Sequence, residues 1–408
     1  MAVAKVIMLI KKDYLYASIW ASLAVGSLLF NTMFGALAAL TFLIAGTVYA
    51  ASGITYTLNV CRANWELFLV PGLCLASVVW SDIPATALRS NIQLLLTTIF
   101  AVVIASRLPL NLFLRASAFI MFLAMVMSLI SSRTALNGMT GEISLIGIFG
   151  SKNYLAANTS MCIALALTLT MNNKIDILSR LLGAVLLLTS TLVLVKAKSL
   201  GAIIFVIGSV FISLLIIFYQ NLSLDKFTRG KLNWLITFVF IFCMFLLVYS
   251  LINGSFNELM YSVGKDPTLT GRTHLWERGV SLIKESPILG VGFQSLFYVG
   301  NNIAEDIWAL HHVPSGAGFN FHNMYVDVAV ELGLLGLFLY LYLIVIFISR
   351  IFDLEHIHLG SSHFFAILIL SYMFLQTFLE AVWFEQFTII HFFMCISWVY
   401  LKEDESYE

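Results

Sequence analysis

Long apolar runs separated by short polar segments make up most of the chain. A helix that crosses a bilayer needs about 20 mainly apolar residues. The runs are continuous rather than alternating, which favours helices over the strands of a β-barrel. We therefore predict an all-α polytopic membrane protein with about twelve transmembrane helices. The segments that we assign to them are 14–30, 33–51, 65–80, 92–105, 116–131, 156–171, 181–195, 200–219, 234–251, 324–351, 363–378 and 389–401.

The composition agrees with this pattern and excludes several classes of protein. Of the 408 residues, 60% are hydrophobic and 11% are charged, whereas a soluble domain carries about 25% charged residues. So few charges cannot coat the water-facing surface of a globular protein of this size. The 22 basic and 22 acidic side chains cancel, which argues against a general nucleic-acid binder. We expect a single integral membrane domain that covers residues 1–408.

The distribution of Lys and Arg predicts how the chain is oriented, because the cytoplasmic loops of membrane proteins are enriched in these residues. If the amino terminus is cytoplasmic, thirteen of the 22 basic residues fall on the inner side and nine on the outer side. Four of those nine lie in one long outer loop, where the rule weakens. We therefore expect both termini in the cytoplasm.

One outer segment, residues 252–322, is far longer than an ordinary connection between helices, which has about two to eight residues. It contains a predicted short helix that Thr273 can cap and that ends before Pro287. The helix is amphipathic, which predicts that it lies at the membrane surface or over the mouth of the bundle. Its apolar face is formed by Leu275, Trp276, Gly279, Val280, Leu282 and Ile283.

Polar side chains gather at the predicted outer ends of several helices. Ionisable groups in or beside a membrane span are costly and often mark a functional site. Lys152, Lys198 and Arg272 could together form a cationic pocket that suits a phosphate or pyrophosphate headgroup. The other candidate site residues are Asp82, Asn153, His322, Asn323, Tyr325, Asp327 and Glu331.

Each of these residues also has a purely structural interpretation. Lys152 and Lys198 could extend to the membrane interface as ordinary flanking residues. Arg272 could pair with Glu277 or with an acidic lipid, and His322 could cap a helix. The adjacent His311 and His312 have no further ligands at a recognisable spacing, so we expect no metal site there.

Five segments, taken in order, resemble the O-antigen ligase and polysaccharide polymerase superfamily of bacterial inner membranes. They are SVVWSDIPATALRSNIQLLLTTIFAVVIASRL, GIFGSKNYLAAN, KAKSLGA, GRTHLWERGVSLIKESPILGVGFQSL and FHNMYVDVAVELGLLGLFLYLYL. The resemblance implies a large periplasmic loop, an undecaprenyl-pyrophosphate-linked glycan donor, and transfer without a metal or another cofactor. It also carries functional roles over to Lys198, Arg272 and His322. Lys198 stands where many ligases have Arg, which favours the exopolysaccharide-polymerase branch.

The sequence hypothesis is therefore a polysaccharide polymerase that joins lipid-linked glycans at the periplasmic face, with inversion at the anomeric carbon. Arg272 and Lys198, supported by Lys152, would bind the pyrophosphate. His322 would act as the base toward the acceptor hydroxyl, oriented by Asp327 or Glu331.

Two other functions stay open at this point. An O-antigen ligase would transfer the glycan to lipid A core or to a protein. A transporter for the same lipid-linked glycan is a third hypothesis, although the polar clusters lie at one face rather than at the midplane. The expected partners are the lipid-linked donor, a lipid-linked glycan or lipid A core acceptor, inner-membrane lipids and a chain-length regulator, with no nucleic acid. The expected location is the bacterial inner membrane.

Overall fold

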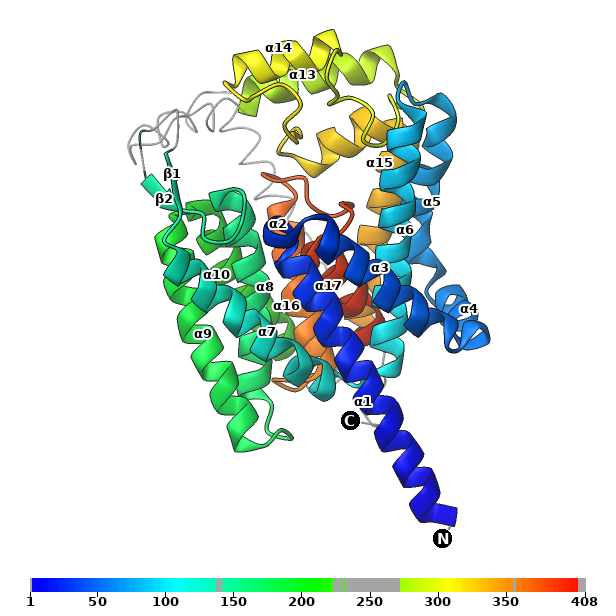
Figure 1. Ribbon diagram of the computed structural model, residues 1–408, viewed down its shortest axis with the longest axis vertical. Helices are drawn as coiled ribbons and strands as arrows, with labels where there is room; N and C mark the ends of the chain where they lie inside the picture. The colour runs from blue at the N-terminus through cyan, green and yellow to red at the C-terminus, as the bar shows by residue number, and fades with distance from the viewer. Residues whose placement is uncertain are drawn as a thin grey trace.

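The computed structural model describes residues 2–136, 141, 143–222, 228, 231, 272–354 and 357–402. The predicted span 234–251 and the first part of the predicted outer loop, 252–271, lie outside these residues. Within the described residues the chain is helical apart from one short two-stranded hairpin (Figure 1).

The elements follow one another in chain order. The first part of the chain contains α1 (Ala2–Leu29), α2 (Asn31–Phe34), α3 (Ala36–Ala51), α4 (Ile54–Ala63), η1 (Trp65–Phe68), α5 (Leu69–Ala76), η2 (Ser77–Trp80), α6 (Pro84–Arg107), α7 (Leu110–Ser131), β1 (Thr134–Leu136) and β2 (Ile143–Leu145). The second part contains α8 (Lys152–Met171), α9 (Ile177–Ala197), α10 (Leu200–Gln220), α13 (Arg272–Glu285), α14 (Asn302–Leu310), α15 (Met324–Asp353), α16 (Ser362–Gln376) and α17 (Ile389–Tyr400). The strands pair antiparallel, with Ala135 opposite Ser144.

Several described helices are long and apolar enough to cross a membrane. There are six of these in the part of the chain that the structure describes: α6, α7, α8, α9, α10 and α15. The pair α3 and α4, bent by 98°, would be a seventh span, and Trp65–Trp80, α16 and α17 are shorter apolar helices. The all-α polytopic membrane architecture is therefore confirmed. The count of twelve spans and the large periplasmic loop stay predictions.

Helices α8, α16 and α17 form the centre of the bundle. Every residue of α17 is buried, and so is nearly all of α16. A helix that is apolar on all sides is expected to be enclosed by other helices, and α6, α8 and α10 supply these contacts. Helices α9, α10 and α15 instead expose large apolar side chains such as Leu188, Phe211 and Phe338, each more than 60% exposed. These side chains suit contact with lipid.

Helix α15 is interrupted at Gly333, and the break shapes one side of the site described below. Gly333 has φ 66° and ψ −167°, a backbone conformation that other residues rarely adopt. A Cβ at this position would lie 2.2 Å from the carbonyl oxygen of Ile288. The backbone N–H of Leu334 donates to the carbonyl of Pro287 (2.8 Å). The segment after α13 therefore replaces helical hydrogen bonds that are lost at the break.

Helices α13 and α14 cover one end of the molecule, above the first part of α15 (Figure 1). The predicted amphipathic helix is confirmed, but it begins at Arg272, so Thr273 lies inside the helix and does not cap it as expected. Val280, however, was wrongly placed on its apolar face, because this side chain is 46% exposed. Helix α14 and the hairpin are too short to give a clear periodic pattern in the sequence. The apolar cluster under α13 and α14 consists of Leu275, Leu282, Leu296, Ile307, Phe321 and Val330.

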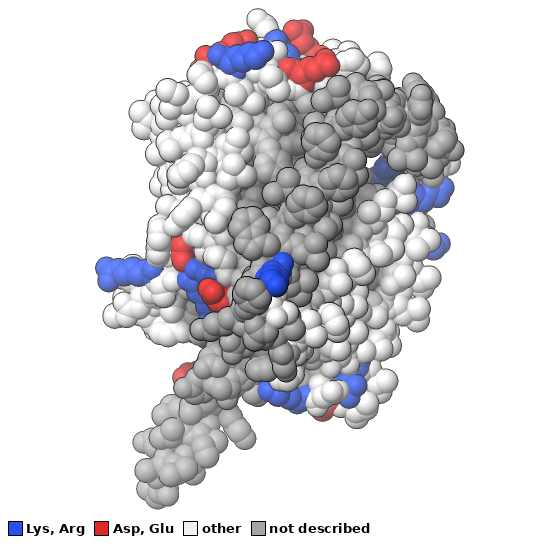
Figure 2. All heavy atoms as spheres, turned by 180° about the vertical axis from the view of Figure 1, so that it is seen from behind, with Lys and Arg blue, Asp and Glu red and all other residues white. Residues whose placement is uncertain are grey.

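Charged side chains are few and lie in separate groups on the surface. Figure 2 shows one group at the end covered by α13 and α14, others at mid-height, and basic side chains again toward the opposite end. At the opposite end Glu66 pairs with Arg350, in the last turn of α15, and with Lys402, which follows α17. Helix α1 also runs toward that end at its start (Figure 1). This arrangement fits the predicted orientation, which stays a prediction.

Candidate functional site

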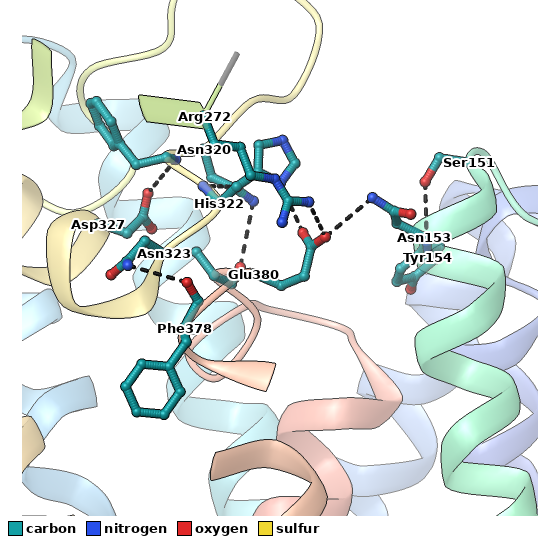
Figure 3. A network of polar contacts seen from close by, with 12 residues as sticks. Ser151, Asn153, Tyr154, Arg272, Asn320, His322, Asn323, Asp327, Phe378 and Glu380 are labelled. Atoms are coloured by element: carbon teal, nitrogen blue, oxygen red, sulfur yellow. Dashed lines mark hydrogen bonds and ion pairs between the residues drawn. The ribbon is translucent and has the colours of Figure 1, made fainter. Parts of the chain in front are cut away.

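Four polar side chains from distant parts of the chain meet beneath α13. Glu380 lies at their centre, in the segment between α16 and α17 (Figure 3). Its Oε1 accepts hydrogen bonds from Arg272 Nη2 (2.7 Å) and Asn153 Nδ2 (3.1 Å). Its Oε2 lies 2.8 Å from His322 Nδ1. These four residues are called the Glu380 cluster below.

Two members of the cluster stand at the beginning of a helix, where the backbone fixes their direction. Arg272 is the first residue of α13, and Asn153 is the second residue of α8. Ser151 caps α8, because its Oγ accepts a hydrogen bond from the backbone N–H of Tyr154 (3.1 Å). Such a cap holds the first turn in place. The short polar sequence before α8 therefore positions Asn153 against Glu380.

His322 directly precedes the cap of α15 and has a left-handed backbone conformation, φ 49°. Its backbone N–H donates to Asn320 Oδ1 (2.9 Å), and its ring meets the ring of Phe319 edge-on, with centroids 5.9 Å apart. Glu380 engages Nδ1, which favours the tautomer with the proton on that nitrogen. Nε2 has no hydrogen-bond partner among the described residues, so its lone pair can accept a proton.

The charges in the cluster stabilise one another. Burial would raise the pKa of the Glu380 carboxyl, but the hydrogen bond and charge of His322 and the charge of Arg272 outweigh it. The pKa of Glu380 is therefore lowered, and this carboxyl is ionised at neutral pH. Its side chain is 16% exposed, as is that of Arg272, and that of His322 is 29% exposed. The cluster is partly sheltered from water yet accessible.

Three predicted site residues support the backbone that presents His322. Asn323 caps α15, since its Oδ1 accepts from the backbone N–H of Tyr325 (3.0 Å). Asp327 Oδ1 accepts from the backbone N–H of Phe321 (3.0 Å). The Tyr325 ring packs against Phe378, with centroids 5.4 Å apart. These residues hold the turn before α15 in shape, and they do not contact Glu380.

Glu331 has a similar supporting contact farther along α15. Its Oε1 accepts from the backbone N–H of Gln294 (3.0 Å), so it fastens the segment that packs against the helix break. The sequence suggested Asp327 or Glu331 as the carboxylate that orients His322. In the structure the carboxylate beside His322 is that of Glu380, which corrects this hypothesis.

The remaining predicted residues lie outside the contacts of Glu380. Lys152 precedes Asn153 at the start of α8, and it has no hydrogen bond or ion pair with any residue that the structure describes. Lys198 lies in the turn between α9 and α10, with φ 51°. Asp82 is exposed. In its motif the neighbouring Trp80 makes the longer-range contact, because Trp80 Nε1 donates to the carbonyl of Leu289 (3.2 Å).

Glu380 itself was missed by the sequence interpretation. It follows the predicted span 363–378, and on the predicted topology it lies on the same side as Arg272 and His322. A carboxylate immediately beside a span is a signal of the kind used above for the other candidates. Applying that rule to the end of this span would have identified Glu380.

The comparisons with known proteins agree with the resemblance found in the sequence. Residues 183–341 match a family model described as O-antigen ligase. Over 271 residues the chain is 30% identical to the exopolysaccharide production protein ExoQ of Rhizobium meliloti (strain 1021). That alignment covers 64% of this chain and 59% of ExoQ, so the chain matches less than two thirds of this relative. Both matches support the resemblance to the O-antigen ligase and exopolysaccharide polymerase superfamily. The matched range 183–341 contains Arg272 and His322 but neither Asn153 nor Glu380.

Proposed function

We propose that the Glu380 cluster is the active site of a cell-surface polysaccharide polymerase. The enzyme would transfer a glycan from an undecaprenyl-pyrophosphate-linked donor to a sugar hydroxyl of a second lipid-linked glycan. The observation that carries the proposal is the pair of His322 and Glu380, which leaves Nε2 of the imidazole open beside Arg272. We propose the periplasmic face of the inner membrane as its location, with both termini in the cytoplasm.

The proposed reaction is a single displacement without a metal. The acceptor oxygen attacks the anomeric carbon of the donor, and its proton moves to His322 Nε2. The bond between the anomeric carbon and the phosphate oxygen breaks, and the lipid pyrophosphate leaves with the electron pair. Glu380 stabilises the imidazolium that forms, as the carboxylate does in a catalytic triad. The anomeric configuration of the product is inverted.

Arg272 can donate hydrogen bonds to Glu380 and to the pyrophosphate of the donor at the same time. A guanidinium has five N–H donors, and Glu380 engages only Nη2. The other nitrogens have no partner among the described residues, so they can bind pyrophosphate oxygens and stabilise charge on the leaving group. Lys152, which is adjacent to Asn153, and Lys198 would add positive charge on the donor side.

His322→Ala tests the proposal. The loss of a general base lowers a rate by about 10²–10⁴-fold, so extension of lipid-linked repeat units by the purified protein should nearly stop. His274→Ala is the matched control, because His274 lies two residues after Arg272 but its side chain is 65% exposed. The control should extend glycans at the normal rate. Full extension by a well-folded His322→Ala protein would contradict the proposed base.

The match to the O-antigen ligase model supports a second candidate, a ligase that uses the same donor chemistry. The two candidates differ in the acceptor, which is a lipid-linked glycan for a polymerase and lipid A core or a protein for a ligase. Product analysis with each acceptor in turn distinguishes them. A transporter would move the lipid-linked glycan without forming a new glycosidic bond.

A further inference from the structure

We infer that a cavity beside the Glu380 cluster binds the terminal sugar of the acceptor glycan and selects an uncharged sugar over one that carries a carboxylate. This inference rests on the proposed function. The cavity has a volume of about 230 Å³, whereas pockets for drug-sized ligands begin at about 300 Å³. It therefore suits one sugar unit rather than a longer stretch of glycan.

The cavity adjoins the proposed base. Phe319 and Asn320 line it, and these two residues contact the ring and the backbone N–H of His322. Ala381, which also lines it, directly follows Glu380 in the chain. His322 itself is not among the lining residues, so the inference requires that the reacting hydroxyl of the bound sugar projects from the cavity toward Nε2.

The chemistry of the lining suits a ligand rich in hydroxyl groups. The charged side chains among the described lining residues are three carboxylates, those of Asp327, Glu331 and Glu385. Carboxyl groups hydrogen-bond readily to hydroxyl groups, and the described lining contains no basic side chain that could pair with an anionic ligand. The aromatic rings in the wall offer apolar surface to the faces of a sugar ring, as is usual in small-molecule sites. They belong to Phe293, Phe297, Phe319 and Phe384.

Glu331 gives a second, independent indication that a ligand belongs in the cavity. The residue is 8% exposed, and its Oε1 is occupied by the backbone N–H of Gln294. Its Oε2 has no hydrogen-bond partner among the described residues. This oxygen is therefore available to form a hydrogen bond with a hydroxyl of the bound sugar.

The same carboxylates would exclude negatively charged groups. A uronic acid or a pyrophosphate in the cavity would place a negative charge in a partly enclosed space beside acidic groups and without a basic partner, which is unfavourable. Figure 3 shows Asp327 and Asn153 on opposite sides of Glu380. The acidic cavity is therefore suited to the acceptor sugar, and the side of Asn153 and Lys152 to the pyrophosphate of the donor.

Two lipid-linked acceptors that differ only in the terminal sugar, glucose or glucuronic acid, test the inference with the full-length protein in lipid nanodiscs. We expect kcat/KM to be at least about tenfold higher for glucose, which corresponds to one unfavourable charge contact. Glu385→Gln should raise KM for the glucose acceptor with kcat nearly unchanged, and it should reduce the preference to about threefold or less. Glu277→Gln is the control, because this side chain lies on α13 and is 77% exposed.

Binding of the two acceptors to the His322→Ala protein measures the same selection without turnover. Equal use of both acceptors by the unaltered protein, or an unchanged preference in Glu385→Gln, would overturn the inference. The inference would also be overturned if the cavity bound Mg²⁺ instead of the sugar. In that case Glu385→Gln would abolish Mg²⁺ binding and leave glycan binding unchanged. If His322→Ala keeps full activity but Glu385→Gln changes the preference, the proposed base is wrong and the sugar site stands.

Discussion

Two glutamates, Glu66 and Glu380, lie toward opposite ends of the molecule, and each contacts two basic side chains. Glu66 pairs with Arg350 and Lys402, and Glu380 with Arg272 and His322. Their own side chains are similarly sheltered, 10% and 16% exposed. Burial and ion pairing therefore do not distinguish a structural cluster from a functional one.

The difference lies in which groups remain available after pairing. At Glu66 the guanidinium of Arg350 is covered by the ring of Trp398, 4.5 Å from its centroid. Lys402 Nζ is engaged by the carbonyl of Ala63 (2.7 Å) as well as by Glu66. At Glu380 the second nitrogen of His322 has no partner among the described residues, and an imidazole nitrogen can accept a proton whereas a guanidinium can only donate hydrogen bonds. An open, titratable group is what marks the Glu380 cluster as a site.

The largest expected contrast is in activity. Glu380→Gln keeps the shape of the side chain but removes the charge that stabilises the imidazolium of His322. We expect the rate of glycan extension to fall by about 10²-fold or more. Glu66→Gln should leave that rate within about twofold and instead lower the free energy of unfolding by about 1–2 kcal/mol. Extension assays and thermal unfolding of both variants measure the two effects.

The opposite pattern would break the comparison. If Glu66→Gln stopped glycan extension while Glu380→Gln did not, the catalytic end of the molecule would be wrongly assigned. Equal loss of activity in both variants, with equal loss of folded protein, would mean that both clusters act only on stability.

Acid should reveal the contribution of Glu380 to stability. The pKa of this carboxyl is held below its ordinary value of 4.5, so its pairing stabilises the folded protein fully above that pH. This stability is lost as the pH falls through the lower pKa of the folded state. The difference in unfolding temperature between the unaltered protein and Glu380→Gln should be present at about pH 5 and should shrink below about pH 4. A difference that disappears between pH 7 and 6 would contradict this assignment.

The sequence predicted the class of fold because membrane helices leave a strong local signal. It failed where a tertiary contact decides the outcome. The bend of 98° between α3 and α4 and the break at Gly333 both fall inside or beside apolar runs that look continuous. At Gly333 the interruption depends on hydrogen bonds to a segment 47 residues earlier, from Leu334 to Pro287, which no local pattern encodes.

The site was predictable in part for the same reason. Arg272, His322 and Asn153 stand in short polar motifs at predicted helix starts, and these motifs identified them. The partner of His322 could not be derived from spacing, because Glu380 follows it by 58 residues and the two helices α15 and α16 lie between them in the chain. Asp327 and Glu331 are nearer to His322 in the sequence, but their hydrogen bonds go elsewhere. Asp327 bonds the turn before α15, and Glu331 bonds the segment that packs against the break in this helix.

The smallest expected effect concerns Asn153. It donates one of the two hydrogen bonds to Glu380 Oε1, and Arg272 keeps the other in its absence. Asn153→Ala should therefore lower the extension rate by only about three- to tenfold, the equivalent of one ordinary hydrogen bond of about 0.7–1.4 kcal/mol. Asn302→Ala, at the exposed start of α14, is the matched control and should change nothing. If Asn153→Ala lowered the extension rate as much as Glu380→Gln does, Asn153 would have to contact the substrate itself. Its single hydrogen bond to Glu380 is too weak to explain so large a loss.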